Sequence, residues 1–370
     1  MNVRFIRIFL AFTVLLSMLG IGFTSTASAL SQLPLPQAQS DDSGLISSMD
    51  APVPQADVKH RDWTREEMMN AKPYPLELSG SGMPSILSDQ DFQPTGKPVF
   101  IEGVLPQNER ADSKIIPSFS LGGEGSLEPS GYTYPAPFTR YENFNKYKNY
   151  PYITVGKLFF TQSGVNYVCS AASIGNYAIW TAGHCVHAGD GSSYSWSYNV
   201  VFVPGYQNGK ALKGQWKYYN LWTKTDWYYN RDYRYDMGGA LLKKKDGYKI
   251  SQKVGNLGFA YNVGLNKHWH VIGYPAAAPF NGLTQQICTA SYAYSDAAFG
   301  SPYPSAIGCD LTGGASGGPW ITNFGGLGYG NYLNGNNSYR HLANIYEMYT
   351  PYFGDAAYAL YYQLVTSVVP

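Results

Sequence analysis

The stretch Trp180-Thr181-Ala182-Gly183-His184-Cys185 places a histidine directly before a cysteine, and a second cysteine, Cys169, stands 16 residues before Cys185. A serine surrounded by glycines follows 132 residues after His184, in Thr312-Gly313-Gly314-Ala315-Ser316-Gly317-Gly318-Pro319. Glycines permit a tight turn that exposes the serine oxygen and directs neighbouring backbone N–H groups toward one point. A core histidine and an ordinary glycine loop are the alternative interpretations. Together in one chain, the two motifs predict a serine nucleophile with a histidine base.

Two aspartates between these motifs compete for the role of the acid. Asp236 precedes Met237-Gly238-Gly239 and the apolar run Ala240-Leu241-Leu242. Asp232, between Arg231 and Tyr233, fits a solvated loop charge. We favour Asp236, which gives the order histidine, aspartate, serine along the chain.

These motifs resemble those of chymotrypsin-like serine proteases over roughly residues 150–345, and Gly273-Tyr274-Pro275 resembles the glutamyl endopeptidase branch. The resemblance implies that His184 is the general base, that Asp236 orients it and that Ser316 is the nucleophile. The backbone N–H groups of Gly314 and Ser316 would form the oxyanion hole. The chain departs from the family at Gly183, where alanine is commoner, and in the Met-Gly-Gly after Asp236.

The resemblance also bears on the four cysteines, which allow three pairings. In the family the cysteines equivalent to Cys169 and Cys185 form a bridge that holds the histidine loop. Cys288 and Cys309 lie between the Gly-Tyr-Pro stretch and the serine, so proximity to the motifs favours a second bridge, Cys288–Cys309.

Residues of a substrate pocket follow from the same resemblance. Asp310 stands six residues before Ser316, where trypsin-like enzymes carry the acid that recognises arginine or lysine. We expect Ser338 and Arg340 on the pocket wall, with His341 as the candidate for the histidine that glutamyl endopeptidases use. Because an unpaired buried charge is costly, we predict that Arg340 neutralises Asp310; the alternative is that it attracts an acidic side chain.

The rest of the chain from about residue 134 predicts an all-β domain. Apolar and β-branched runs alternate with Gly, Asn and Asp turns. About 230 residues are too many for one small barrel and suit two packed six-stranded antiparallel β-barrels. The expected strands include Tyr152–Val155, Val201–Val203, Ala240–Leu242, Trp269–Ile272 and Trp320–Thr322.

The N-terminal part predicts export. Arg4 and Arg7 precede an apolar run, Ile8–Leu19, and small residues that end in Ala27-Ser28-Ala29, the layout of a cleaved signal peptide over residues 1–29. An uncleaved membrane anchor is the alternative. Residues 30–130 are rich in Pro, Ser and Gly and predict a poorly structured pro-region or linker, with one helix over Trp63–Asn70. The catalytic domain would span residues 131–370 of a secreted, extracellular protein.

The composition limits the classes of molecule that the chain is expected to bind. With 26 basic and 25 acidic side chains, the net charge of +1 argues against nucleic-acid binding. His268 and His270 could bind zinc, but no third ligand stands nearby, so we expect no metal and no cofactor. The aromatic stretch Trp216–Tyr235 could bind carbohydrate, although packing is the commoner role. We expect polypeptide substrates, a monomer, and no membrane association after signal cleavage.

Two function classes remain. One is a secreted serine endopeptidase that acts through an acyl-enzyme, and the other is a non-catalytic binding module on the same fold. Activation departs from trypsin-like zymogens, in which an aspartate just before the serine pairs with the new N-terminus. Ala315 takes that position here. We therefore expect any inhibition by the pro-region to come from covering the cleft, unless the pro-region assists folding instead.

Overall fold

The computed structural model describes residues 44–48, 61–78, 86–87, 94, 96–108 and 136–370. The chain divides into two units, residues 1–37 and 38–370, and the first lies outside the described residues. The predicted signal peptide falls in that first unit. No helix among the described residues has the length and apolar character needed to cross a bilayer.

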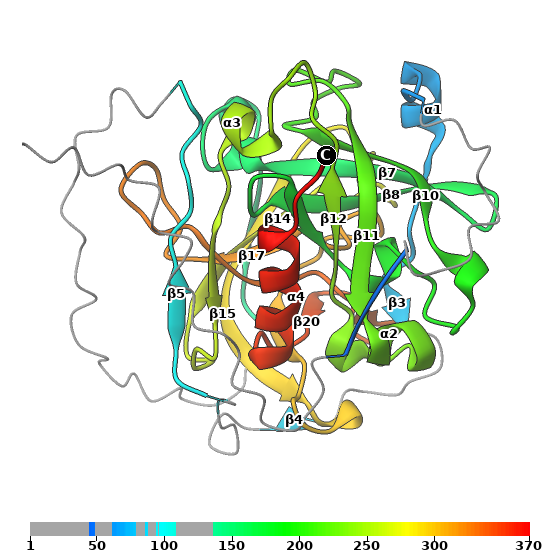
Figure 1. Ribbon diagram of the computed structural model, residues 1–370. Coiled ribbons are helices and arrows are strands. Elements are labelled where there is room, and N and C mark those ends of the chain that lie inside the picture. Colours follow the sequence, from blue (N-terminus) through cyan, green and yellow to red (C-terminus); the bar gives the residue numbers. More distant parts are fainter. Residues whose placement is uncertain (1–43, 49–60, 79–85, 88–93, 95, 109–135) are drawn as a thin grey trace, which may run out of the picture. The chain divides into compact units, whose positions relative to one another are not determined.

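Six antiparallel strands close into a ring in the first half of the domain (Figure 1). Each strand pairs with the next, in the order β10, β7, β8, β9, β12 and β11, and β11 returns to β10. The barrel interior is apolar, as the alternation of side chains on closed sheets requires. The strands are β7 (Val155–Gln162), β8 (Val165–Ser173), β9 (Ala178–Thr181), β10 (Tyr198–Pro204), β11 (Trp216–Lys224) and β12 (Gly238–Leu242).

A second sheet of ten strands forms the other half, with the path β20-β16-β15-β14-β17-β18-β13-β5. The end strand β20 also approaches β18 within this path, where the N–H of Asn336 in β18 donates to Thr350 Oγ1 in β20 at 2.8 Å. β13 pairs with β18 in parallel, unlike the antiparallel pairs expected. The strands on this path are β5 (Val99–Ile101), β13 (Gly258–Tyr261), β14 (His268–Gly273), β15 (Gln286–Asp296), β16 (Ser305–Gly308), β17 (Pro319–Thr322), β18 (Tyr332–Asn336) and β20 (Glu347–Thr350). Off the path, β4 (Ile86–Leu87) and β6 (Thr139–Glu142) both pair with β15.

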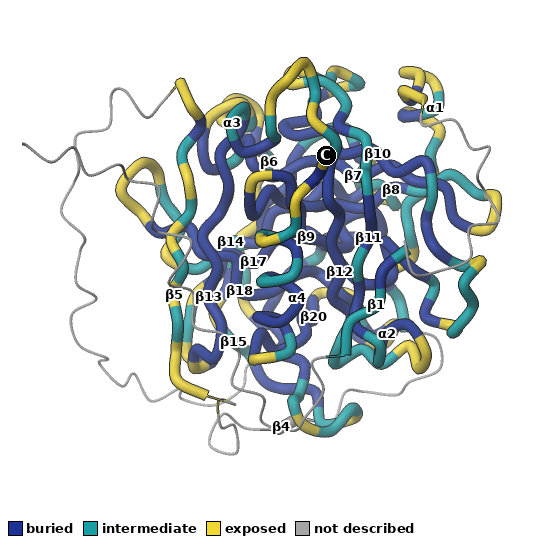
Figure 2. The backbone as a smooth tube through the Cα atoms, viewed as in Figure 1, coloured by how far each residue is buried: buried dark blue, intermediate teal, exposed yellow. Residues whose placement is uncertain are grey.

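The largest apolar core lies between the two sheets and under the C-terminal helix α4 (Asp355–Thr366), red in Figure 1. Trp180 from the first sheet and Phe259 from the second both pack against Phe353, and Phe259 stacks on Tyr361 of α4. Figure 2 shows the strands of both sheets as largely buried. This core fixes the two halves against each other, so a site built from both has a rigid frame. Two shorter helices complete the domain, α2 (Thr225–Asn230) and α3 (Ile250–Val254).

Most of the predicted strands are present, and Tyr152–Val155 differs. Residues Tyr152–Thr154 form a 3-10 turn, and the strand begins only at Val155. The N–H and the hydroxyl of Thr154 both donate to the carbonyl of Pro151, at 3.0 and 2.7 Å, which closes a turn in place of extended backbone. The β-branched residues of this stretch predict a strand, but composition alone does not show that the Thr154 side chain hydrogen-bonds to the local backbone and favours a turn.

The described parts of residues 30–130, predicted to be a poorly structured pro-region or linker, include short strands that pair with both sheets. β1 (Leu45–Ser47) and β2 (Lys72–Pro73) join the first sheet, and β5 joins the second. The predicted helix exists as α1 (Arg65–Asn70), capped by Thr64 and Glu67. Next to α1, Trp63 is buried against the barrel and donates from Nε1 to the carbonyl of Asn199 at 2.9 Å. The segment is thus ordered by pairing with strands of both sheets.

Candidate active site

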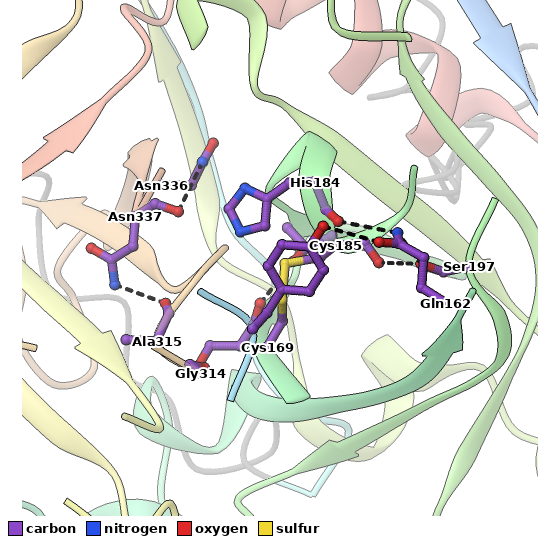
Figure 3. Close-up of a disulfide and its surroundings, with 12 residues drawn as sticks. Gln162, Cys169, His184, Cys185, Ser197, Gly314, Ala315, Asn336 and Asn337 are labelled. Atoms are coloured by element: carbon purple, nitrogen blue, oxygen red, sulfur yellow. Dashed lines mark hydrogen bonds between the residues drawn. A yellow bond between two sulfur atoms is a disulfide. The ribbon is translucent and has the colours of Figure 1, made fainter. Parts of the chain in front are cut away.

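His184 lies in a 3-10 turn, Gly183–Cys185, that follows β9 directly. The turn is tied to β8 by the Cys169–Cys185 disulfide, one of the two pairings favoured from the sequence (Figure 3). A Cβ at Gly183 would lie 2.7 Å from Trp227 Cγ and 3.0 Å from Asp236 Oδ1. The close packing of Trp227 therefore explains why glycine, and not alanine, precedes the histidine in this chain.

Asp236 is fully buried and accepts three hydrogen bonds. Its Oδ1 accepts the backbone N–H of His184 at 2.8 Å, while Oδ2 lies 2.8 Å from His184 Nδ1 and accepts Ser338 Oγ at 2.5 Å. Because a buried carboxylate can only accept, these contacts place the ring proton on Nδ1 and leave Nε2 as the acceptor.

The competing carboxylate, Asp232, is occupied elsewhere. It caps the 3-10 turn Tyr233–Tyr235 and pairs with Arg234, whose Nε donates to both carboxylate oxygens at 3.0 Å. The structure brings Asp236, and not Asp232, to the histidine.

Ser316 lies in the glycine-rich loop before β17, and the loop packs against the strand that leads to His184. Gly317 has φ +75°, and a Cβ there would come within 2.0 Å of Thr181 Oγ1, so this position requires glycine. Ser170 of β8 holds the loop from the same side, because its N–H donates to the Ser316 carbonyl at 2.7 Å and its Oγ to the Gly314 carbonyl at 3.0 Å.

Two buried polar atoms of this site have no hydrogen-bond partner among the described residues, namely His184 Nε2 and Ser316 Oγ. Such groups are rare in folded proteins and commonly mark functional positions. The two atoms are not hydrogen-bonded to each other in this structure, so the acceptor on His184 and the hydroxyl of Ser316 are both available for a ligand.

Three consecutive residues after β17 connect the halves of the site, and sequence reasoning did not foresee their roles. Asn336 Nδ2 donates to the Asp236 carbonyl at 3.2 Å, Asn337 Nδ2 donates to the Ala315 carbonyl at 2.9 Å (Figure 3), and Ser338 donates to the Asp236 carboxylate. Ser338 was expected on the pocket wall. No local signal identifies these contacts, since each joins residues far apart in the chain.

The predicted Asp310–Arg340 pair is not formed. Asp310 accepts Arg140 Nε at 3.1 Å, and Arg340 Nε donates instead to Glu77 Oε1 at 3.0 Å. Glu77 belongs to the segment that was predicted to be a pro-region or linker, so the sequence did not place it near Arg340. His341 is buried beside Asp296, with Nε2 and Oδ2 2.7 Å apart.

Tyr74, from the segment expected to be a linker, lies directly over the histidine. The two rings stack with centroids 4.9 Å apart and planes 29° apart. Burial, with a further contribution from the Asp236 charge, raises the pKa of Tyr74 well above its ordinary value, so the phenol stays neutral.

The structure offers no metal site in the part of the chain that it describes. Cys169, His184 and Cys185 come close together, but both sulfurs are in the disulfide and cannot ligate. His268 and His270 have adjacent rings, and burial lowers the pKa of His270 to about 4, yet its ring stacks on Phe324. Within the aromatic stretch, Trp216, Trp227 and Tyr228 are buried in packing.

Comparisons with known proteins agree with this geometry. The trypsin family model matches residues 145–355, more than half of the chain. The chain is similar to the protease Anisep from Arthrobacter nicotinovorans, at 33% identity and TM-score 0.55, over 62% of this chain and 100% of that one. It is also similar to the thermostable serine protease AL20 from an extremophilic microorganism, at 34% identity and TM-score 0.54, over 58% and 98%. A search of curated proteins finds no match. The chain therefore belongs to the trypsin family and is a serine-type endopeptidase.

Proposed function

We propose that the chain is an exported endopeptidase that cleaves polypeptides through an acyl-enzyme on Ser316, with His184 as general base and Asp236 as the residue that orients it. The observation that carries this proposal is the pair of contacts to Asp236, which hold the imidazole with Nε2 as an acceptor. That atom and the Ser316 hydroxyl are both free of other partners in the described structure.

The proton movements follow from this arrangement. Ser316 Oγ attacks the scissile carbonyl while His184 Nε2 takes the hydroxyl proton. The positive charge on the imidazole is then stabilised by the buried Asp236 carboxylate. His184 returns the proton to the leaving nitrogen, and a water molecule attacks the acyl-enzyme by the same route, which releases the acid and regenerates the serine.

The developing oxyanion would be stabilised by the N–H groups of Gly314 and Ser316. Gly314 has φ +94°, a conformation that glycine adopts readily. In the intact chain this N–H already has an acceptor outside the loop, the carbonyl of Tyr74 at 3.2 Å. A preorganised donor of this kind is worth about 10²–10³-fold in turnover in serine proteases.

Export is supported by the apolar N-terminal stretch of the sequence and by the presence of two disulfides, Cys169–Cys185 and Cys288–Cys309. Disulfides persist in oxidising compartments outside the cytosol. A non-catalytic binding module would have no need for an oriented imidazole beside an unpartnered serine.

A fluorophosphonate probe tests the proposal, since it forms a covalent adduct only with an activated serine. We expect one adduct, on Ser316 in the peptide map of processed protein, and none in Ser316→Ala or His184→Ala protein that retains its circular dichroism spectrum. Peptide hydrolysis in a clean Ser316→Ala preparation would contradict the assignment of the nucleophile.

A further inference from the structure

The segment Lys72–Leu78 runs past the site, from β8 of the first sheet to a separate two-stranded sheet that its end forms with residues 340–341. At its start, β2 pairs in parallel with β8, and the Tyr74 N–H donates to the Val168 carbonyl at 3.1 Å. At its end, β3 (Glu77–Leu78) pairs in parallel with β19 (Arg340–His341), and the Arg340 N–H donates to the Leu76 carbonyl at 2.9 Å. The segment is therefore fixed by backbone pairing on both sides of the histidine and serine.

Tyr74 lies near the centre of this segment and contacts His184, Gly314 and a neighbour of the histidine loop, Gln162. Its ring stacks on His184, its carbonyl accepts the N–H of Gly314, and its hydroxyl donates to Gln162 Oε1 at 2.9 Å. Gln162 in turn reaches the loop of the histidine, with Nε2 3.4 Å from the His184 carbonyl. A substrate carbonyl could not reach the Gly314 N–H while Tyr74 holds it.

Two side chains anchor the distal end. Leu76 is 2% exposed and packs in the core cluster of the second sheet, beside Ala315. Glu77 pairs with Arg340, whose side chain is only 11% exposed. A charge-assisted pair with a forked arginine is specific in geometry and, where partly buried, stronger than a pair at the surface.

The serine loop is already ordered beneath this segment. Ala315 is fully buried, and its carbonyl accepts a hydrogen bond from Asn337 Nδ2. A Cβ added at Gly273 would lie 3.0 Å from the Cβ of Ala315. The loop therefore takes this shape in the intact chain, without a new N-terminal ammonium. Any latency of the intact chain must come from occupation of the cleft.

We propose that residues 72–78 are a tethered competitive inhibitor of the site, anchored by the Glu77–Arg340 pair and by Tyr74 on His184. This inference rests on the proposed function of Ser316. A tethered segment acts at the millimolar effective concentration of an intramolecular ligand, so modest contacts keep it bound.

The segment is built to resist cleavage. The carbonyl that accepts the Gly314 N–H is that of Tyr74, in the peptide bond between Tyr74 and Pro75. Cleavage of this bond would require the tertiary nitrogen of Pro75 to leave. From there the chain continues toward Arg340. Proline before and after Tyr74 also restricts the backbone to extended conformations, which lowers the entropy lost on docking.

The test measures the rate at which a small fluorophosphonate labels Ser316 in the full chain and in charge variants. We expect Glu77→Arg and Arg340→Glu each to label about tenfold faster, the equivalent of about 1.4 kcal/mol of lost docking. The double variant, which restores an opposite-charge pair, should return to the slow rate. Glu66→Arg, the same charge change on an exposed face of α1, is the matched control and should label slowly.

Tyr74→Gly supplies a second route to release that leaves both charges in place, and it should also label quickly. Rapid and equal labelling of every protein, or a cut at Tyr74–Pro75 in the purified full chain, would overturn the inhibitor while leaving Ser316 as the nucleophile. No labelling of any variant, with normal circular dichroism, would overturn the nucleophile and this inference together.

Discussion

Replacing Asp236 with asparagine should lower kcat/KM of the processed enzyme by about 10⁴-fold while leaving the fold intact. The structure shows why the isosteric change is so severe. Oδ1 accepts the backbone N–H of His184, which can only donate, so the amide oxygen must take this place. The amide NH₂ then faces His184 Nδ1, which must accept. The ring proton moves to Nε2, and the base can no longer take the proton of Ser316.

The assay compares initial rates of peptide hydrolysis for processed wild type, Asp236→Asn and Asp232→Asn, with circular dichroism as the check on folding. Asp232→Asn is the matched control, because the same change falls four residues away on a carboxylate that pairs with Arg234. We expect wild-type rates for the control. A large loss in Asp232→Asn with near-normal rates in Asp236→Asn would refute the reasoning.

Three further outcomes follow from the packing and charges. Reducing Cys169–Cys185 and Cys288–Cys309 should lower the free energy of unfolding by about 2–5 kcal/mol for each bridge, measured by urea denaturation with and without reductant. Lys157 is buried, and burial lowers its pKa to about 7 from 10.5 in the unfolded chain. Between pH 7 and pH 10.5 the unfolded state therefore binds more protons than the folded state, so the free energy of unfolding should rise with pH. Lys157→Met should remove a slope of up to about 1.4 kcal/mol per pH unit above pH 7, and equal slopes in both proteins would contradict the shift. Because Ala315 has no charge, acetylating the N-terminus of the processed enzyme should leave its peptidase rate unchanged, and loss of activity would mean that another carboxylate pairs with that terminus.

Local sequence was sufficient for the parts of the site that are built locally. The turn at His184 follows from its neighbouring glycine and cysteine, and the tight turn around Ser316 follows from glycines that alone tolerate the positive φ at positions 314 and 317. The strands around both motifs follow from apolar alternation. These features depend on backbone preferences over a few residues, which the sequence states directly.

The tertiary structure decided what those motifs contact. It selected Asp236 over Asp232, moved Ser338 from the expected pocket wall to the carboxylate, and separated Arg340 from Asp310. Arg340 meets Glu77 across 263 residues of chain. Charge alone cannot choose among several candidate carboxylates at such separations, because the choice depends on which sheet edges pair and which loops close. Composition predicted that the N-terminal segment builds little core of its own, and only the tertiary structure shows where its described part is held, by β2 on β8 and by β3 on β19.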